Sequence, residues 1–297
     1  MSSLRNHFEQ ILESAGVQVN GSNPWDITVH NEELFSRISR DGTVGLGEAY
    51  MDGWWDCESI DEMITRSFRA GLEDKIRSNF KFFIYLIGLR LMNRQSESRA
   101  FQVAEQHYDI GNDIFERMLD KHMNYSCGFW ESANCLEDAQ IAKMEMICEK
   151  LQLERGMKVL EIGCGWGALA RWMSQRYGVS VTGITVSKEQ AKLARSRCAG
   201  LPVSIELADY RALNGEYDRI VSVGMLEHVG QKNYRTYFAK ARSLLKDQGL
   251  FLLHTIGAGR GGFATDRWIE KYIFPNGVLP PADALAKTAG EFFTIDD

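Results

Sequence analysis

Residues 159–167 read VLEIGCGWG: an apolar run with β-branched residues is followed at once by alternating glycines. The apolar half is typical of a buried strand, and Gly163 and Gly165 let the chain turn tightly before the helical pattern GALARWMSQRYG at 167–178. A glycine loop between a strand and a helix brings a ligand against the helix N-terminus. The stretch predicts a βα unit of an open α/β sheet.

The chain that follows alternates between strand and helix patterns. Helices are expected at 167–178, 188–200 and 233–249, and strands at 157–164, 179–186, 203–210, 217–225 and 250–256. This alternation predicts βαβ units and a parallel, Rossmann-like sheet with helices on both faces, an α/β fold. Residues 136–153, ahead of the glycine loop, have the pattern of an amphipathic helix.

The first part of the chain has a different pattern. Residues 1–92 are expected to form a small, mostly helical N-terminal domain that glycines break into short pieces. The polar run NRQSESR at 93–99 is the best linker. We therefore expect a second, catalytic domain over 93–297.

Composition excludes several classes of protein. The 297 residues are 44% hydrophobic and 25% charged, which is ordinary for a globular protein, and a net charge of −6 argues against a nucleic-acid partner. The six cysteines have no metal-type spacing, so we expect reduced thiols in a cytoplasmic protein. The first residues have no signal-peptide pattern.

One segment suggests a membrane surface. No window contains the roughly 20 apolar residues of a membrane span, and the nearest, NFKFFIYLIGLRLMNR at 79–94, is interrupted by Gly88 and Arg90. From Arg66 to Arg99 there are eight basic and three acidic residues, a local net charge of +5. The pattern fits a helix lying on an anionic membrane. A core helix of the N-terminal domain fits it equally well.

Three sequence features favour S-adenosylmethionine as the ligand of the glycine loop. Glu161 stands two residues before the first glycine, where a carboxylate can receive the ammonium group of a methionine moiety. The next strand ends ITVS, without the acid that a dinucleotide-binding dehydrogenase uses to hold ribose. The third strand ends ADY, and Asp209 and Tyr210 suit an adenine. A dehydrogenase is thereby disfavoured.

The chain resembles the cyclopropane fatty acid synthases, which are S-adenosylmethionine-dependent enzymes with a class I methyltransferase fold. The matching stretches include LGEAYMDGWWDC, EQHYDIGNDIFERMLD, YSCGFW, VLEIGCGWG, GITVSKEQ, VGMLEHVG, FLLHTIG and KYIFPNG. The resemblance implies that the cofactor contacts Tyr125, Ser126, Glu161, Gly163, Gly165, Thr185, Gln190, Asp209 and Tyr210.

The resemblance also implies an unusual reaction. A methylene group passes from S-adenosylmethionine to the cis double bond of an unsaturated phospholipid acyl chain, and a carbocation loses a proton as the cyclopropane ring closes. In this family a bound bicarbonate ion is the general base. Its cage matches Cys127, Glu227, His228, His254 and the backbone of Ile256. An ionised Glu227 has no proton to donate, so bicarbonate must donate its O–H to that carboxylate, which anchors the base.

Each of these residues also has a structural interpretation. Cys127 alone suits a buried thiol, His254 a satisfied core histidine, and Glu227 a helix cap. His228 can serve structure alone. The aromatic residues that might line an acyl pocket have core packing as their alternative; they are Tyr108, Phe129, Trp130, Tyr272 and Phe274.

Two other functions stay open. One is a lipid C-methyltransferase that adds a methyl branch without closing the ring, and the other is a catalytically silent lipid-binding homologue. A class I methyltransferase sheet has seven strands, and this chain ends at GEFFTIDD, where FFTID can at most begin the sixth. We therefore expect the C-terminal strands to be missing. The resemblance further implies a homodimer, peripherally associated with the inner membrane.

Overall fold

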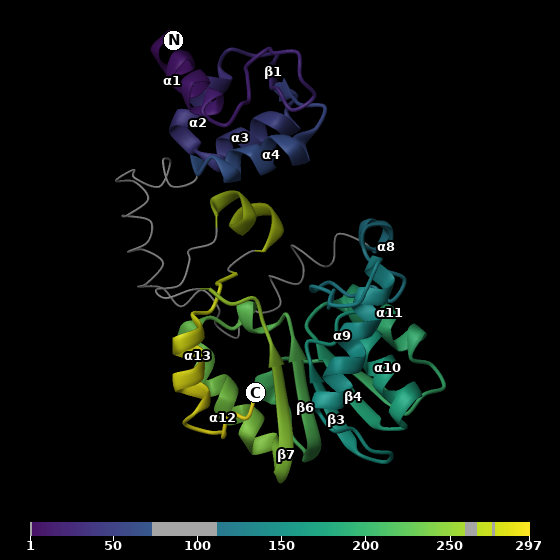
Figure 1. Cartoon of the computed structure of the whole chain (residues 1–297). Coiled ribbons are helices and arrows are strands. Elements are labelled where there is room, and N and C mark those ends of the chain that lie inside the picture. The colour runs from purple at the N-terminus through teal and green to yellow at the C-terminus, as the bar shows by residue number, and fades with distance from the viewer. Residues whose placement is uncertain (1, 73–111, 259–265, 275–276) are drawn as a thin grey trace. The chain divides into compact units, whose positions relative to one another are not determined.

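The computed structural model describes residues 2–72, 112–258, 266–274 and 277–297 (Figure 1). The chain divides into two compact units: Met1–Met92 with Asp266–Lys271, and Asn93–Thr265 with Tyr272–Asp297. The predicted domain boundary, the linker at 93–99, the basic apolar segment at 79–94 and Tyr108 lie outside the described residues.

The first unit packs short helices around an apolar core. Its elements are α1 (Ser2–Glu13), β1 (Thr28–Val29), α2 (Leu34–Asp41), α3 (Thr43–Met51), β2 (Trp55–Asp56) and α4 (Ile60–Arg69). Strands β1 and β2 pair antiparallel, which the helical pattern did not predict. Leu34, Ala49 and Trp55 lie in the core. Asp26 is also buried, and its carboxylate accepts the backbone N–H groups of Gln18 and Asn23.

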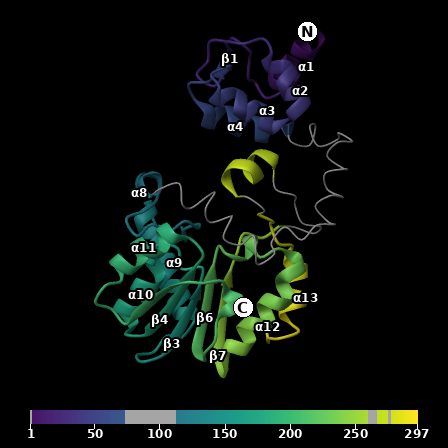
Figure 2. The ribbon, with the colours of Figure 1, turned by 180° about the vertical axis from the view of Figure 1, so that it is seen from behind.

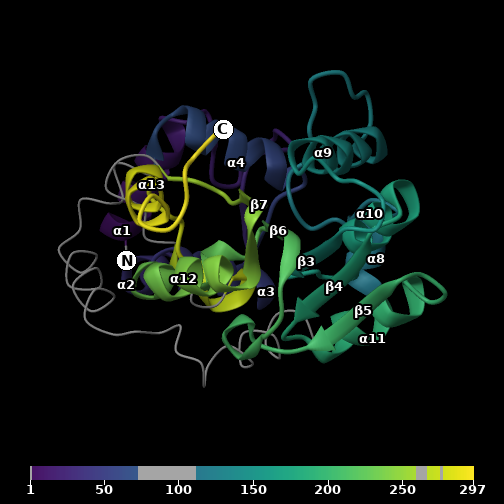
Figure 3. The same ribbon diagram turned by 90° about the horizontal axis from the view of Figure 1, so that it is seen from below.

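The second unit is built on a five-stranded parallel sheet, as predicted. Its strands are β3 (Lys158–Ile162), β4 (Ser180–Thr185), β5 (Val203–Leu207), β6 (Tyr217–Val223) and β7 (Leu245–His254). Their order is β5-β4-β3-β6-β7, and Figure 3 shows them side by side in that order. β3 and β6 are neighbours although β4 and β5 come between them in sequence. The strand order therefore reverses beside β3, where open α/β sheets bind ligands.

Side-chain alternation along the strands divides the core into two layers. Val159, Val181 and Val221 face the helices α9 (Leu136–Lys150) and α10 (Ala168–Tyr177). Leu160 and Ile220 face the opposite side, where α12 (Tyr234–Leu244) packs. α13 (Ala282–Ala289) lies on that side with α12 (Figures 1 and 2). Both faces are thus covered, and the central strand β3 is buried at every residue after Lys158.

The remaining elements of this unit are short or lie at the sheet's carboxyl edge. They are α8 (Asp113–Met118), α11 (Lys188–Arg197) and the 3₁₀ turns η1 (Tyr210–Ala212), η2 (Leu226–His228) and η3 (Gln231–Asn233). The π-helical turn η4 (Ile269–Ile273) has residues 269–271 in the first unit and 272–273 in the second. The glycine loop, η1 and η2 follow β3, β5 and β6 directly. Parallel strands bring these three segments to one edge.

One prediction near the C-terminus was wrong. The helix expected over 233–249 ends at Leu244, because Leu245 turns to an extended conformation and packs over Gly249, where a Cβ would lie 2.6 Å from the leucine side chain. The chain therefore enters β7 earlier than expected. FFTID at 292–296 forms no strand, in keeping with the expectation that it could at most begin one, and Phe292 and Phe293 pack against the core beside α12.

Candidate active site

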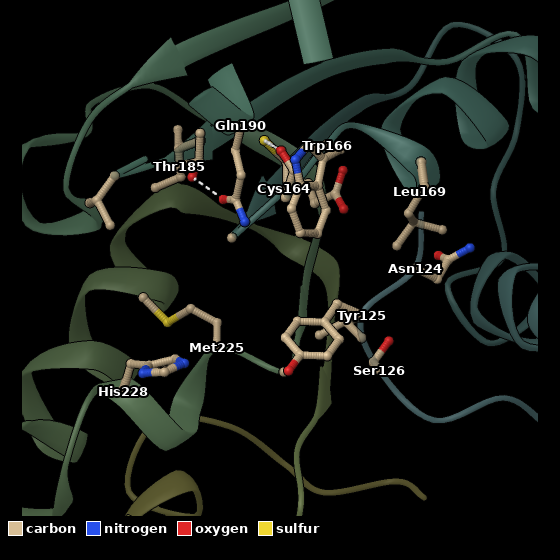
Figure 4. Close-up of a pocket in the computed structure, with 18 of the residues that line it drawn as sticks. Asn124, Tyr125, Ser126, Cys164, Trp166, Leu169, Thr185, Gln190, Met225 and His228 are labelled. Atoms are coloured by element: carbon tan, nitrogen blue, oxygen red, sulfur yellow. Dashed lines mark hydrogen bonds between the residues drawn. The ribbon is translucent and has the colours of Figure 1, made fainter. Parts of the chain in front are cut away.

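A pocket opens at the carboxyl edge of the sheet, beside the glycine loop. Figure 4 shows Thr185 and Gln190 facing Tyr125 and His228 across it. All the residues predicted to bind the cofactor line this pocket: Tyr125, Ser126, Glu161, Gly163, Gly165, Thr185, Gln190, Asp209 and Tyr210. They come from four separate stretches of sequence, which the parallel topology brings together.

The glycine loop keeps the floor of the pocket open. Gly163 has φ +85°, and a Cβ there would meet the Met225 side chain at 3.0 Å. Gly165 has φ +52°, and a Cβ there would meet nothing within 4 Å. At Gly165 the conformation demands glycine, while the open space lets a ligand approach the backbone before α10.

Glu161 is the buried acid of this pocket. It is 4% exposed, and its Oε2 has no hydrogen-bond partner among the described residues. Burial raises the pKa of Glu161 to about 8, opposed by the N–H of Ala170 in the first turn of α10 and by the Lys143 ammonium. An unsatisfied carboxyl oxygen in an apolar wall suits a cationic ligand group.

Thr185 orients the amide of Gln190. The Thr185 hydroxyl donates to Gln190 Oε1 at 2.7 Å, and Ser187 Oγ caps α11 by accepting the Gln190 N–H at 3.1 Å. With its oxygen engaged, the amide has its NH₂ group available toward the pocket (Figure 4). Donors of this kind suit ribose hydroxyls.

Asp209 and Tyr210 follow β5 at the pocket's far wall. Both Asp209 oxygens are engaged by Arg211, one accepting its backbone N–H at 2.9 Å and the other its guanidinium at 3.2 Å. The Tyr210 ring is 3% exposed and packs edge-on against Tyr237 at 5.2 Å between centroids. This wall is therefore fixed by the protein's own contacts.

The Tyr125–Phe129 turn is held against α9 by two polar side chains. Gln140 Nε2 donates to the Ser126 carbonyl at 2.8 Å, and Lys143 Nζ donates to Ser126 Oγ at 2.7 Å. Lys143 lines the pocket and was not among the predicted residues. Its sequence signal is present, since it lies four residues from both Ala139 and Ile147 on the buried face of an amphipathic helix.

Glu227 sits just beyond β6 in η2 and faces β7. Its Oε1 accepts the N–H of Ile256 at 2.7 Å, while its Oε2 is buried without a hydrogen-bond partner in the described part of the chain. Gly224, between the two strand ends, donates its N–H to the His254 carbonyl at 3.0 Å. The Ile256 N–H, expected to face an anion, is thus directed at Glu227.

Cys127 and His254 lie together, with Cys127 Sγ 3.5 Å from His254 Nε2. Burial lowers the pKa of His254, and the charge of Lys143 lowers it further against the opposing effect of Glu227. His254 Nδ1 is buried and finds no partner within the described ranges. Glu227 and His254 thus each have one buried polar atom that the described residues leave unsatisfied.

His228 is placed differently from the other four residues of the predicted cage. It lines the cofactor pocket, its ring centroid lies 6.1 Å from that of Phe274, and burial lowers its pKa to about 4. A neutral imidazole at this position can orient a ligand but carries no charge at neutral pH.

The predicted aromatic residues separate into two groups. Phe274 lies near the pocket, 6.0 Å from Tyr125 between ring centroids. Phe129, Trp130 and Tyr272 are exposed at 36%, 53% and 37%.

Comparison with known proteins gives the family. The family model of the mycolic acid cyclopropane synthetases matches residues 95–296 of this chain. The chain belongs to this family. It is 53% identical over 288 residues to the cyclopropane-fatty-acyl-phospholipid synthase of Escherichia coli K12. The aligned residues cover 97% of this chain and 75% of that protein.

Two other relatives widen the comparison. The tuberculostearic acid methyltransferase UfaA1 of Mycobacterium tuberculosis is 32% identical over 304 residues, 95% of this chain and 70% of that protein. The crystal structure of the mycolic acid cyclopropane synthase CmaA1 with SAH and CTAB superposes with a TM-score of 0.62 and 33% identity, covering 66% of this chain and 76% of that chain. The predicted class I methyltransferase fold is confirmed, and the chain is an S-adenosylmethionine-dependent methyltransferase.

The pocket fits that family's cofactor. Glu161 supplies an unsatisfied acid, Gly165 an open cradle before a helix N-terminus, and Gln190 an amide donor. When bound, S-adenosylmethionine supplies an electrophilic methyl group.

Proposed function

We propose that this enzyme converts the cis double bond of unsaturated phospholipid acyl chains to a cyclopropane ring. The methyl carbon that S-adenosylmethionine would supply separates from its sulfur, leaving S-adenosylhomocysteine, bonds to both alkene carbons and loses one proton to a base. The observation that carries the proposal is the position of Glu227, whose carboxylate is held by the Ile256 N–H with its second oxygen buried and unsatisfied next to the cofactor pocket. The 53% identity to the Escherichia coli synthase supports the substrate class.

Bicarbonate is the proposed base, and the residues present fit it. Glu227 Oε2 can accept an O–H, and His254 can donate to an anionic oxygen from whichever nitrogen carries its proton. Bicarbonate is a small, weakly nucleophilic ion, so it would take the proton without trapping the carbocation as an ester. Cys127 completes this group through its contact with His254.

The test is a lipid assay on vesicles of cis-monounsaturated phospholipid. Wild-type protein with S-adenosylmethionine should yield lipid that has gained one CH₂ and resists hydrogenation. Glu227→Gln, which keeps the volume but has no anionic oxygens, should lose about 100-fold in turnover. Because Glu227 does not line the cofactor pocket, binding of S-adenosylhomocysteine should be unchanged. Full turnover in the variant would refute the role of Glu227.

A second candidate is methyl branching without ring closure, favoured by the similarity to the tuberculostearic acid methyltransferase. The first carbon–carbon bond is the same in both reactions, and they differ in which carbon loses the proton. A product that takes up hydrogen on catalytic reduction would identify this activity. Cofactor binding without either product would identify a silent lipid-binding protein.

We also propose that the enzyme acts in the cytoplasm as a homodimer on the surface of the inner membrane. Its substrate is a bilayer lipid, and the sequence at 79–94 is apolar with basic flanks. Within the described ranges no helix combines the length and apolar character that crossing a bilayer requires. Sedimentation alone and with vesicles tests both parts: a monomer, or protein that stays in the supernatant with anionic vesicles, would contradict them.

A further inference from the structure

Lys143 is a buried cation without an ion-pair partner in the described part of the chain. It is 3% exposed on the inner face of α9, and no described carboxylate forms an ion pair with it. It donates to the Ser126 hydroxyl oxygen at 2.7 Å, although an ammonium group has three N–H donors. Burying an unpaired ammonium costs several kcal/mol, so its retention calls for an anionic partner.

The neighbouring acids do not supply that partner. Asp120 is buried nearby, but its oxygens accept the backbone N–H groups of His122 and Asn124 and the Asn124 side chain. Glu161 lies on the same pocket wall and within electrostatic reach, yet it makes no ion pair with Lys143. The pocket therefore presents a cation and an acid that do not contact each other.

An α-amino acid group is complementary to this arrangement. It carries an ammonium and a carboxylate on adjacent atoms, so it can satisfy Glu161 with one and Lys143 with the other. The surrounding wall is apolar, with Met144, Ile147 and Leu169, which strengthens both contacts by excluding water.

We propose that Lys143 binds the carboxylate of the methionine moiety of S-adenosylmethionine while Glu161 binds its ammonium group. This assignment rests on the proposed use of that cofactor. The alternative anion is bicarbonate, which Lys143 would reach from the side of Cys127 and His254. Lys143 lines the cofactor pocket whereas those two residues do not, which favours the cofactor.

Burial lowers the pKa of Lys143 to about 8, so the side chain is mainly charged at pH 7. Its bond to Ser126 also couples it to the turn that carries Tyr125 and Cys127. A role confined to holding that turn predicts a different response to mutation than a role in binding the carboxylate. The two can be separated by choosing ligands with and without the carboxylate.

The experiment measures binding by titration calorimetry with two ligands: S-adenosylhomocysteine and its decarboxylated analogue, which keeps the ammonium group. Lys143→Met and Lys143→Gln should each bind S-adenosylhomocysteine about 10- to 100-fold more weakly. Both should bind the decarboxylated analogue within about 3-fold of wild type. Lys143→Gln keeps a hydrogen-bonding group, so agreement between the two variants assigns the loss to the charge.

Gln140→Met is the matched control, because Gln140 lies on the same face of α9 and holds the same turn through the Ser126 carbonyl without a charge. It should weaken both ligands to the same extent. Equal losses for both ligands in the Lys143 variants would overturn the assignment, as would unchanged S-adenosylhomocysteine binding with a raised bicarbonate requirement in turnover. If wild-type protein binds no S-adenosylhomocysteine, the proposed cofactor falls as well.

Discussion

At the scale of single residues, the pocket buries the carboxyl group of Glu161, where its ionised form is energetically unfavourable. Burial raises the pKa of Glu161 to about 8, so without the cofactor the folded protein holds this proton at pH 7. The unfolded chain releases it near the ordinary carboxylate pKa, about 4.3. Folding is therefore linked to pH through this one side chain.

The stability of the cofactor-free protein should fall as pH rises from about 5 to 8. Over this range the folded state binds more protons at Glu161 than the unfolded state does, which gives a slope of about 1.4 kcal/mol per pH unit. Glu161→Gln removes this contribution, so the variant should gain stability relative to wild type as pH rises. Urea unfolding of both proteins at several pH values measures the difference. If the free energy of unfolding depended on pH in the same way for both proteins, the raised pKa of Glu161 would be refuted.

Cofactor binding should release a proton at pH 7. An ammonium group beside Glu161 favours the ionised carboxylate and lowers its pKa, so the proton held in the free protein leaves. Titration calorimetry with S-adenosylhomocysteine in buffers of different ionisation enthalpy counts the protons. Glu161→Gln should bind more weakly and release none. Proton release that persists in this variant would assign the effect to another group.

At the scale of elements, α9 acts as a template for the turn at Tyr125–Phe129. The helix holds Ser126 through Gln140 and Lys143, and the Ala139 carbonyl accepts the N–H of Phe129 at 2.9 Å. A Cβ on Gly128 would lie 2.7 Å from Ala139 Cβ, so turn and helix are in close contact. Both the cofactor pocket and Cys127 depend on this contact.

Gly128→Ala should separate the turn from α9. The crowding should lower the free energy of unfolding by about 1–3 kcal/mol, and S-adenosylhomocysteine binding should weaken with it. Adding Ala139→Gly removes the opposing methyl group, so the double variant should recover binding beyond what the single variants predict. Denaturant unfolding and calorimetry on all four proteins measure the coupling. Additive losses would show that the two positions do not interact.

The sequence predicted this part of the fold unevenly, for physical reasons. Apolar stretches that alternate with helix patterns mark all five parallel strands, because a sheet covered on both faces needs apolar side chains. The glycine loop marks the end of β3. The wrong helix end at Leu244 arises from tertiary packing: the run from Lys246 to Gln248 suits a helix, but Leu245 is buried in the core. A two-residue pairing such as β1–β2 has no periodicity to detect.

The site was predictable where its residues follow strand ends and less so elsewhere. Glu161, Gly163 and Thr185 are fixed by local patterns beside β3 and β4. Lys143 was missed because a lysine in an amphipathic helix is expected in solvent, and only the packed structure shows it buried. The contact of Ile256 N–H with Glu227 depends on how η2 meets the end of β7, which no spacing in the sequence encodes.

At the scale of the whole molecule, the proposed membrane contact is the apolar run at 79–94 together with the basic residues beside it, which include Lys75, Arg77 and Lys81. Replacing Lys75, Arg77 and Lys81 with glutamine should weaken binding to anionic vesicles by about 5-fold for each charge removed. S-adenosylhomocysteine binding by the catalytic unit should be unaffected. Vesicle sedimentation at low and high salt measures the effect. Equal binding by variant and wild type would place the membrane contact elsewhere.

Ring closure requires that the transferred carbon lose a proton, and one isotope measurement tests this loss directly. Wild-type protein is incubated with S-adenosylmethionine bearing a CD₃ group and cis-monounsaturated phospholipid vesicles, and the product is weighed by mass spectrometry. Ring closure predicts that the lipid gains one CD₂ group, since one deuteron leaves the transferred carbon. A product that keeps all three deuterons and loses a proton of the acyl chain would contradict the claim and identify a methyl-branching enzyme.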